Sequence, residues 1–255
     1  MTQEVAIISV VRDPRMYERC VSANPFCSDC RLVTLDNRDA NLPVTVLYNK
    51  AICNLLKEGF NGWMVFCHED WQAGTRLADA FAGLGEDSLY GVVGVDVESW
   101  PKADLMVVKG SIWQGSKDGG SSFFFSGRDA EGKVGTFDCQ CLIVHSSLFS
   151  DRELRFDENL RFDMYVEDFC AAAAERYGIN SYVIPLKCTH WSKGSISGGF
   201  RESMDYVRDK YAGAKYRYAS IAGHKNCFGA RAGKRLLKWK DKPWNAFVRF
   251  LYDIG

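Results

Sequence analysis

The chain of 255 residues is 47% hydrophobic and 13% aromatic, enough to bury a large core within one α/β domain. Its 32 basic and 32 acidic residues cancel, so overall charge gives no reason to expect a nucleic-acid partner. The first residues lack the apolar run of a signal peptide, and no stretch approaches the roughly 20 apolar residues of a membrane span. These features predict a cytoplasmic protein.

Strands and helices alternate through the first part of the chain. Continuous apolar runs predict buried strands at residues 4–11, 31–35, 63–67 and 90–95. Apolar residues at helical spacing predict helices at residues 43–58 and 76–84. Gly59 and Gly85 follow these two helices and are well placed to end them. The alternation is typical of a mainly parallel α/β sheet between helices.

The pattern is interrupted between residues 96 and 136, where seven glycines predict a loop-rich insert. Its centre, Gly119-Gly120 followed by three phenylalanines at 123–125, predicts either an acceptor loop or a covered hairpin. The α/β pattern then resumes, with strands predicted at residues 141–144 and 182–186 and a helix at residues 164–177.

The end of the chain has a different character. Residues 201–218 and 231–254 are predicted to be helices, and the second begins with six basic residues before an apolar face containing Trp244 and Phe247. Basic residues beside an aromatic amphipathic helix are typical of peripheral proteins on anionic membranes. We expect residues 201–255 to be a helical extension, either packed on the first domain or contacting the inner membrane face.

Ten cysteines raise the question of a disulfide framework. The chain is too long and too apolar to need one, and several cysteines lie in apolar patterns where cysteine acts as a small hydrophobic residue. Cys27 and Cys30 form a lone Cys-x-x-Cys pair with no second pair at zinc-site spacing. We therefore expect reduced thiols.

Three polar residues, His68, Glu69 and Asp70, directly follow the predicted strand at residues 63–67. The carboxyl ends of strands in open α/β sheets are where ligand crevices form. A carboxylate such as Asp70 suits Mg²⁺ or Mn²⁺, the ions that accompany diphosphates. The alternative is an ordinary solvated turn between a strand and a loop.

Four segments occur in an order that resembles a known family. They are residues 48–52 (Tyr-Asn-Lys-Ala-Ile), 65–71 (Val-Phe-Cys-His-Glu-Asp-Trp), 156–168 (Phe-Asp-Glu-Asn-Leu-Arg-Phe-Asp-Met-Tyr-Val-Glu-Asp) and 188–194 (Cys-Thr-His-Trp-Ser-Lys-Gly). Together they resemble the GT-A fold glycosyltransferases of the family 2 type, in particular a bacterial subgroup whose Asp-x-Asp motif reads His-x-Asp. The resemblance implies a GT-A catalytic domain over residues 1–200, with a mainly parallel central sheet between helices.

The resemblance also implies a function. It is the transfer of a sugar from a nucleotide-diphosphate donor to an acceptor hydroxyl, with inversion, in polysaccharide or glycoconjugate synthesis. The acceptor would be a glycan or a lipid-linked molecule. Asp70 and His190 match the ligands of a divalent ion, Mn²⁺ or Mg²⁺, and a neutral His68 stands where the family usually has aspartate. The residues expected to bind the donor are Asp36, Asn49, His68, Glu69 and Lys193.

The acceptor hydroxyl must lose a proton as it attacks, which requires a carboxylate within hydrogen-bond reach. Asp168 falls on the family's catalytic-base position, and Glu167 precedes it. We therefore expect Asp168 to be the base, with Glu167 as the alternative. The structural alternative for Asp168 is that the dipole of its helix favours an acidic residue in the first turn.

Two other functions fit part of the sequence. One is a non-catalytic protein that binds sugar nucleotides or glycans on the same fold, because fold alone does not establish activity. The other is a metal-dependent nucleotidyltransferase, which would normally carry a glycine-rich phosphate loop after the first strand. Residues 10–14 (Val-Val-Arg-Asp-Pro) are not such a loop.

Overall fold

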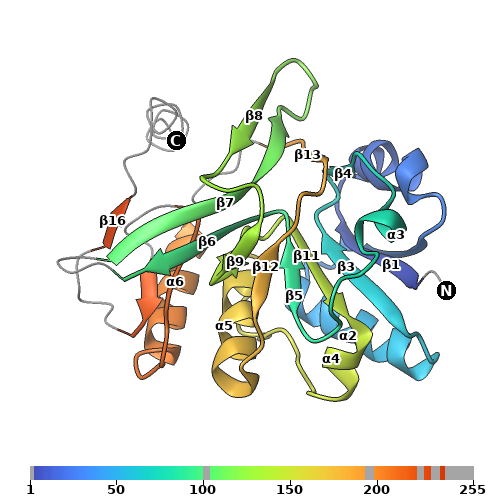
Figure 1. Ribbon diagram of the computed structural model, residues 1–255. Helices are drawn as coiled ribbons and strands as arrows, with labels where there is room; N and C mark the ends of the chain where they lie inside the picture. The colour runs from blue at the N-terminus through green and yellow to red at the C-terminus, as the bar shows by residue number, and fades with distance from the viewer. Residues whose placement is uncertain (1–2, 100–103, 193–197, 223–226, 231–235, 239–255) are drawn as a thin grey trace.

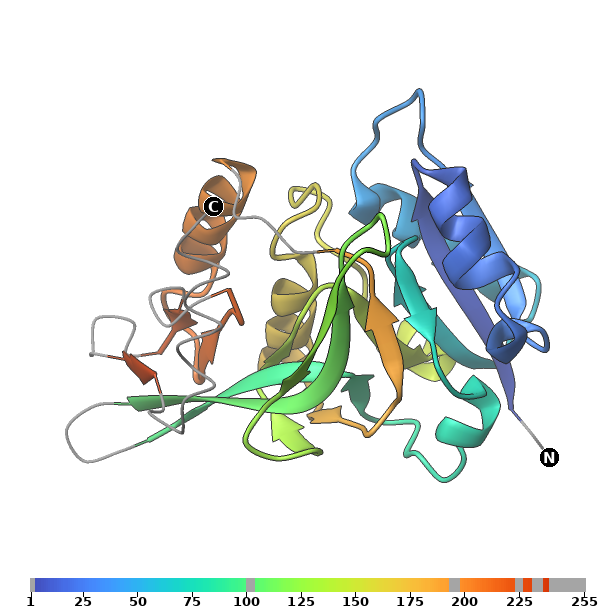
Figure 2. The same ribbon diagram turned by 90° about the horizontal axis from the view of Figure 1, so that it is seen from above.

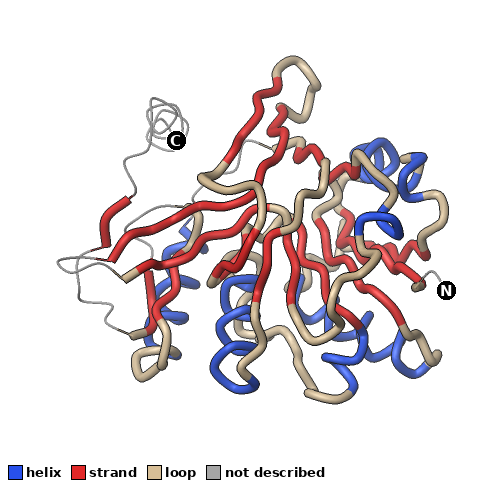
Figure 3. Tube along the Cα trace, in the orientation of Figure 1, coloured by secondary structure: helices blue, strands red, loops and turns tan. Residues whose placement is uncertain are grey.

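The computed structural model describes residues 3–99, 104–192, 198–222, 227–230 and 236–238 (Figure 1). Two sheets lie next to each other, and the longer helices gather along one side of the first sheet (Figure 3). Seen from above, the long strand β7 of the second sheet extends outward, away from the first sheet (Figure 2).

The first sheet has the strand order β2-β1-β3-β11-β5-β12-β9. Within the described residues, five of these strands share one direction and β11 and β9 oppose it. Every residue of β3 and β11 is buried, which explains why such strands have continuous apolar sequences. The strands are β1 (Glu4–Val11), β2 (Arg31–Asp36), β3 (Gly62–Cys67), β5 (Leu89–Gly91), β9 (Gly132–Val134), β11 (Cys141–His145) and β12 (Ser181–Val183).

Helices cover both faces of this sheet, and successive strand residues point to alternate faces. In β3, Met64 and Phe66 join one hydrophobic cluster, whereas Trp63 and Val65 join another. The first cluster includes residues of α2 (Val44–Lys57), α4 (Ser146–Ser150) and α5 (Tyr165–Tyr177). The second includes residues of α1 (Pro14–Tyr17), η1 (Glu18–Ser22), η2 (Pro25–Cys27) and α3 (Leu77–Ala80). The predicted α/β class with a mainly parallel sheet between helices is confirmed.

The predicted loop-rich insert is wrong, because residues 104–137 contain four strands. The second sheet has the order β10-β6-β7-β13-β4, with β8 and β16 also paired to β7. The prediction of one strand at residues 90–95 was also incomplete, since the chain leaves the first sheet after Gly91 and enters the second at Val93. The strands are β4 (Trp71–Ala73), β6 (Val93–Glu98), β7 (Asp104–Gly115), β8 (Ser122–Ser126), β10 (Thr136–Phe137), β13 (Cys188–His190) and β16 (Leu236–Lys238).

Close packing of neighbouring strands explains the glycines that made this region resemble a loop in the sequence. Gly110 has a φ of +91°, and a Cβ there would lie 2.0 Å from the carbonyl oxygen of Val92. A Cβ on Gly127 would lie 2.4 Å from the carbonyl oxygen of Val108. The residues that interrupt the apolar pattern are therefore the ones that let the strands approach.

The predicted helix at residues 201–218 is shorter than expected: α6 covers Gly198–Lys210, and Arg217–Ala219 form strand β14 instead, paired with β15 (Cys227–Gly229). Within the predicted helix at 231–254, Leu236–Lys238 form β16 beside β7, and the rest lies outside the described residues. Residues of α6, β14 and β15 share one hydrophobic cluster with α5, because Met204, Tyr218 and Phe228 pack there. The division at residue 200 stays a prediction.

Two further expectations concern cysteines and membranes. All ten cysteines are free thiols. Within the described ranges, none of the helices combines the length and apolar character needed to cross a membrane.

Candidate active site

Strands β1, β2 and β3 run parallel, so their carboxyl ends meet at one edge of the first sheet. A cavity of about 440 Å³ opens at this edge, within the size range of small-molecule sites. Its lining includes residues after each of these strands, the first turn of α5 and the segment after β14. The side chains that line the cavity include Arg12, His68, Asp70, Gln114, Lys117, Phe162, Glu167, His190 and Ser220.

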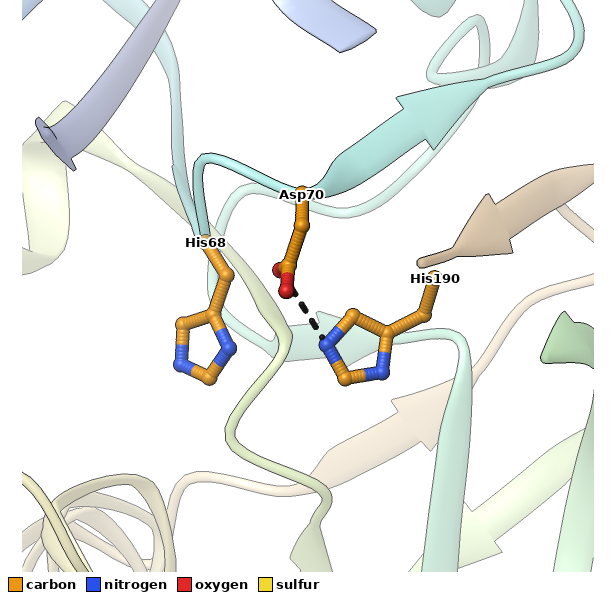
Figure 4. A group of neighbouring side chains, drawn as sticks. All are labelled: His68, Asp70 and His190. Atoms are coloured by element: carbon orange, nitrogen blue, oxygen red, sulfur yellow. Dashed lines mark ion pairs between the residues drawn. The ribbon is translucent and has the colours of Figure 1, made fainter. Parts of the chain in front are cut away.

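His68, Asp70 and His190 come together at this cavity (Figure 4). His68 and Asp70 lie between β3 and β4, and His190 ends β13. Pairing of β13 with β4 sets His190 opposite Trp71, and the Trp191 amide donates to the Asp70 carbonyl oxygen at 2.9 Å. One candidate ligand atom from each of the three side chains lies within 4.8 Å of the other two.

A hydrogen bond fixes the orientation of the His190 ring. Its Nδ1 lies 3.1 Å from Gln114 Oε1, which can only accept, so Nδ1 carries a proton. The other nitrogen, Nε2, lies 3.3 Å from Asp70 Oδ1 (Figure 4). Both atoms are buried, and neither has a hydrogen-bond partner among the described residues. Two acceptors at this separation need a proton or a cation between them, so the pair fits a metal ion.

The His68 ring is held from two sides. Tyr165 donates its hydroxyl to the Cys139 carbonyl oxygen at 2.8 Å, so at 3.4 Å from His68 Nε2 that hydroxyl can only accept. This leaves the Nδ1 lone pair available for a ligand. Phe162 stacks on the ring with a centroid separation of 5.3 Å.

Electrostatics favour a neutral imidazole beside an ionised carboxylate. Burial lowers the pKa of His68 to about 4, so the ring is uncharged at neutral pH. Burial alone would raise the pKa of Asp70, but the adjacent His190 and His68 hold that pKa well below its usual range. A neutral imidazole and a carboxylate are the protonation states in which these groups bind metals.

Glu167 faces the cavity from the first turn of α5, where it is 4% exposed. Its Oε1 accepts a hydrogen bond of 2.7 Å from Ser220, and its Oε2 has no partner among the described residues. Burial raises its pKa to about 7, and the nearby Asp138 and Asp163 act in the same direction. A carboxylate with this pKa can both accept and release a proton near neutral pH.

The neighbouring Asp168 is placed differently. It lies outside the described lining of the cavity, and its Oδ1 is 2.7 Å from Lys210 Nζ. Tyr211 donates to the same oxygen at 3.0 Å. Lys210 also contacts Asp157, so the lysine of α6 joins α5 to the loop before it. Asp168 therefore has an evident structural role.

The other residues expected to bind the donor occupy several environments. Glu69 lines the cavity, and its Oε2 accepts hydrogen bonds from the backbone amides of Arg12 and Asp13 at 2.6 and 2.8 Å. Asn49 is outside the described lining and exchanges two hydrogen bonds of 2.9 Å with the Phe156 backbone. Asp36 is also outside it, exposed and paired with Arg38. Lys193 lies outside the described residues.

Sequence reasoning missed Lys117, which lines the cavity from the turn between β7 and β8. Its charge contributes to lowering the pKa of Asp70. The only signal was the adjacent Gly119-Gly120, which marked a turn without indicating where it would lie. Lys117 supplies a cation beside the three candidate ligands.

No family model matches the sequence. No curated protein matches it either.

Solved structures with a similar chain path include A197 from STIV, which is 14% identical over 74% of this chain and 86% of A197, with a TM-score of 0.41. GalNAc-T7 with UDP, GalNAc and Mn²⁺ is 7% identical over 83% of this chain, with a TM-score of 0.48, and the match spans about half of GalNAc-T7, 49%. S. aureus TarS 1-349 in complex with UDP is 13% identical over 84% of this chain and 67% of TarS 1-349, with a TM-score of 0.47. At these values the likenesses assign neither an activity nor a ligand to this chain.

Proposed function

We propose that this protein is a metal-dependent glycosyltransferase that moves a sugar from a nucleotide-diphosphate donor to an acceptor hydroxyl. The observation that carries the proposal is the pairing, in one cavity, of the His68–Asp70–His190 cluster, in which Asp70 and His190 are buried, with a separate carboxylate, Glu167, whose pKa is about 7. Sugar transfer needs both parts, because one neutralises the leaving diphosphate and the other accepts the acceptor's proton.

The three candidate ligands would hold the divalent ion, and Lys117 would contact the phosphates from the opposite strand turn. Bound there, the ion would neutralise negative charge that develops on the diphosphate. Two imidazoles in the ligand set favour Mn²⁺ over Mg²⁺, which prefers oxygen ligands. A fixed His190, oriented by Gln114, would bind the ion with little reorganisation.

Glu167 is the proposed base. As the acceptor oxygen forms a bond to the anomeric carbon, the bond from that carbon to the diphosphate oxygen breaks and the hydroxyl proton passes to Glu167. Nucleoside diphosphate leaves with the bonding electron pair. A single displacement of this kind inverts the anomeric configuration, in line with the resemblance of the sequence to inverting enzymes. A role in polysaccharide or glycoconjugate synthesis, with a glycan or lipid-linked acceptor, belongs to the same proposal.

A binding screen tests the proposal directly. The full chain is heated with UDP-, GDP-, dTDP- and CMP-sugars, each with Mn²⁺, with Mg²⁺ or with EDTA, and the unfolding midpoint is measured. One diphosphate donor should raise the midpoint strongly with Mn²⁺ and weakly with EDTA, because a ligand that binds only the folded state stabilises it. Slow release of nucleoside diphosphate from that donor should accompany binding. A donor that binds without any release, alone or with acceptors, would instead favour the non-catalytic binding protein.

A further inference from the structure

The sheet that supplies His190 to the cavity has a second face that the proposed site does not use. In β7, β8, β13 and β4, the row containing Gln114 and His190 faces the cavity. The adjacent row, one residue earlier along β7, must face the opposite way because strand residues alternate. Strand pairing aligns four residues in this outer row: Phe124, Trp113, Thr189 and Gln72.

The two aromatic members of the outer row are unusually open to solvent. Trp113 is 48% exposed and Phe124 is 41% exposed, and their ring centroids lie 5.4 Å apart. Both sit on the β7–β8 hairpin, which rises from the body of the molecule (Figure 1). Contiguous exposed apolar surface marks binding sites, whereas single exposed apolar residues do not, and these two neighbouring rings form a contiguous surface.

The polar half of the row is also fixed in place. Trp191 donates from Nε1 to Gln72 Oε1 at 2.9 Å, which orients the Gln72 amide. The Trp191 ring packs on Gly115, where a Cβ would lie 2.5 Å from the ring, and so forms a wall beside the row. Four strands at the usual spacing make the row about 14 Å long.

We propose that this outer row binds a neutral glycan chain and presents it to the cavity as the acceptor. The four residues of the row carry no charge, and the Arg19 guanidinium beside them lies over the Trp191 ring, 4.6 Å from its centroid. Aromatic faces next to a hydroxyl and an amide match a sugar, which has an apolar C–H face and a rim of hydroxyl groups. That the glycan is the acceptor rests on the proposed function.

Area argues against a second protein as the occupant. Two rings of this kind bury on the order of 150–250 Å² each, whereas a stable protein interface buries about 1,200–2,000 Å² in total. Continuity with the cavity supports a chain-like ligand, since the same hairpin carries Trp113 on its outer face and Lys117 into the cavity lining. A glycan held on the row would raise the local concentration of acceptor ends near the donor.

Binding of the full chain to an array of immobilised neutral oligosaccharides tests the proposal without requiring turnover. The array carries α- and β-linked chains of glucose, galactose, mannose and N-acetylhexosamine. The test variants are Trp113→Ala and Phe124→Ala. Phe26→Ala is the matched control, because Phe26 is similarly exposed at 38% but lies in η2.

The wild-type chain should bind at least one oligosaccharide class, and each test variant should weaken that binding by about tenfold or more, as loss of a central aromatic contact does. Phe26→Ala should bind as the wild type does, and so should Asp70→Ala, which separates this proposal from the proposed function. Absence of array binding by the wild type, or equal binding by all variants, would overturn the proposal. So would a concentration-dependent dimer in sedimentation that Trp113→Ala abolishes, because it would assign the row to a second copy.

Discussion

Two neighbouring carboxylates of α5, Glu167 and Asp168, are both buried yet lie in differently built regions. Glu167 faces the cavity, shares one hydrogen bond with Ser220 and has an oxygen without a partner among the described residues. Asp168 faces α6, where Lys210 and Tyr211 satisfy its charge and its hydrogen bonds. Successive helix residues differ by about 100° in direction, which is enough to send the two side chains to different neighbours.

The difference shows that burial alone does not mark a catalytic carboxylate. Burial raises the pKa of Asp168 as well, but the Lys210 cation at 2.7 Å opposes this rise and, with Tyr211, occupies the oxygen that a substrate would need. A buried carboxylate without a cation has a raised pKa and retains an acceptor for a ligand. On the cavity side of α5, Glu167 therefore keeps an oxygen available to a ligand, whereas on the α6 side the oxygen of Asp168 is bound by Lys210 and Tyr211.

The largest effect should come from the cavity side, at Asp70. Asp70→Ala removes the carboxylate that faces His190, so the ion would lose its only anionic candidate ligand among the described residues. We expect turnover to fall by about 10³-fold or more, since charge stabilisation of the leaving group is usually the largest catalytic contribution. Steady-state rates of nucleoside diphosphate release and Mn²⁺-dependent midpoint shifts would measure this.

The matched control for that variant is Asp79→Ala, which removes an exposed carboxylate on α3. Both variants should unfold within about 4 °C of the wild type, equal to roughly 1 kcal/mol for a chain of this size. Unchanged Mn²⁺-dependent donor binding in Asp70→Ala would remove Asp70 from the metal site.

The next effect compares the two carboxylates directly. Glu167→Gln keeps the shape and the hydrogen bond to Ser220 but removes the basic oxygen, so turnover should fall by about 10²-fold or more while donor binding persists. Asp168→Asn should retain most of its turnover and lose stability, because Lys210 would face a neutral amide. Rates and chemical denaturation of the same two variants distinguish the roles. A dead Asp168→Asn beside an active Glu167→Gln would reverse the assignment.

Removing Lys210 should test whether the side of α5 that faces α6 serves stability rather than catalysis. Lys210→Met leaves Asp157 and Asp168 without their shared cation, and we expect the free energy of unfolding to fall by about 2–3 kcal/mol. This is below the roughly 3–5 kcal/mol typical of a broken buried pair, because 21% of the lysine side chain stays exposed. Urea denaturation would measure the change, with Lys50→Met on the exposed side of α2 as the control. Equal stability of the two variants would contradict the role of Lys210.

The first sheet and its helices could be predicted from the sequence because their signals are local. Strands β1, β3 and β11 are continuous apolar runs, and α2 and α5 end at glycines with φ of +77° and +67°. The second sheet could not be predicted, because its pattern depends on contacts distant in sequence. Glycine usually indicates a loop, yet Gly110 lies within β7. A glycine is needed there because the backbone of Val92, the residue before β6, packs against it.

The candidate site was only partly predictable for the same reason. The segment His68-Glu69-Asp70 was identifiable from its position after a buried strand. His190 was expected from the family resemblance, and the pairing of β13 with β4 brings it beside Asp70. Sequence could not separate Glu167 from Asp168, because that choice depends on Ser220 and Lys210, both distant along the chain. Lys117 could not be found, since no local pattern places a turn residue at a cavity.

The smallest predicted effect tests how strongly Ser220 tunes the base. Its hydroxyl donates to Glu167 Oε1 and thereby favours the ionised carboxylate, whereas burial raises the pKa to about 7. A base must be unprotonated, so wild-type turnover should rise with pH through about 7 and then level off. Ser220→Ala removes the stabilising hydrogen bond, which should raise the pKa of Glu167 further and move this rise to higher pH by about one unit. Turnover at neutral pH would then fall several-fold and recover at higher pH, a recovery that simple misfolding would not produce.

Ser146→Ala, which removes another buried hydroxyl that accepts from the Gly62 amide, should leave the profile unchanged. Identical pH profiles for wild type and Ser220→Ala would mean that Ser220 does not set the pKa of the base, and would leave the Lys210 cation beside Asp168 as the feature that distinguishes the two carboxylates.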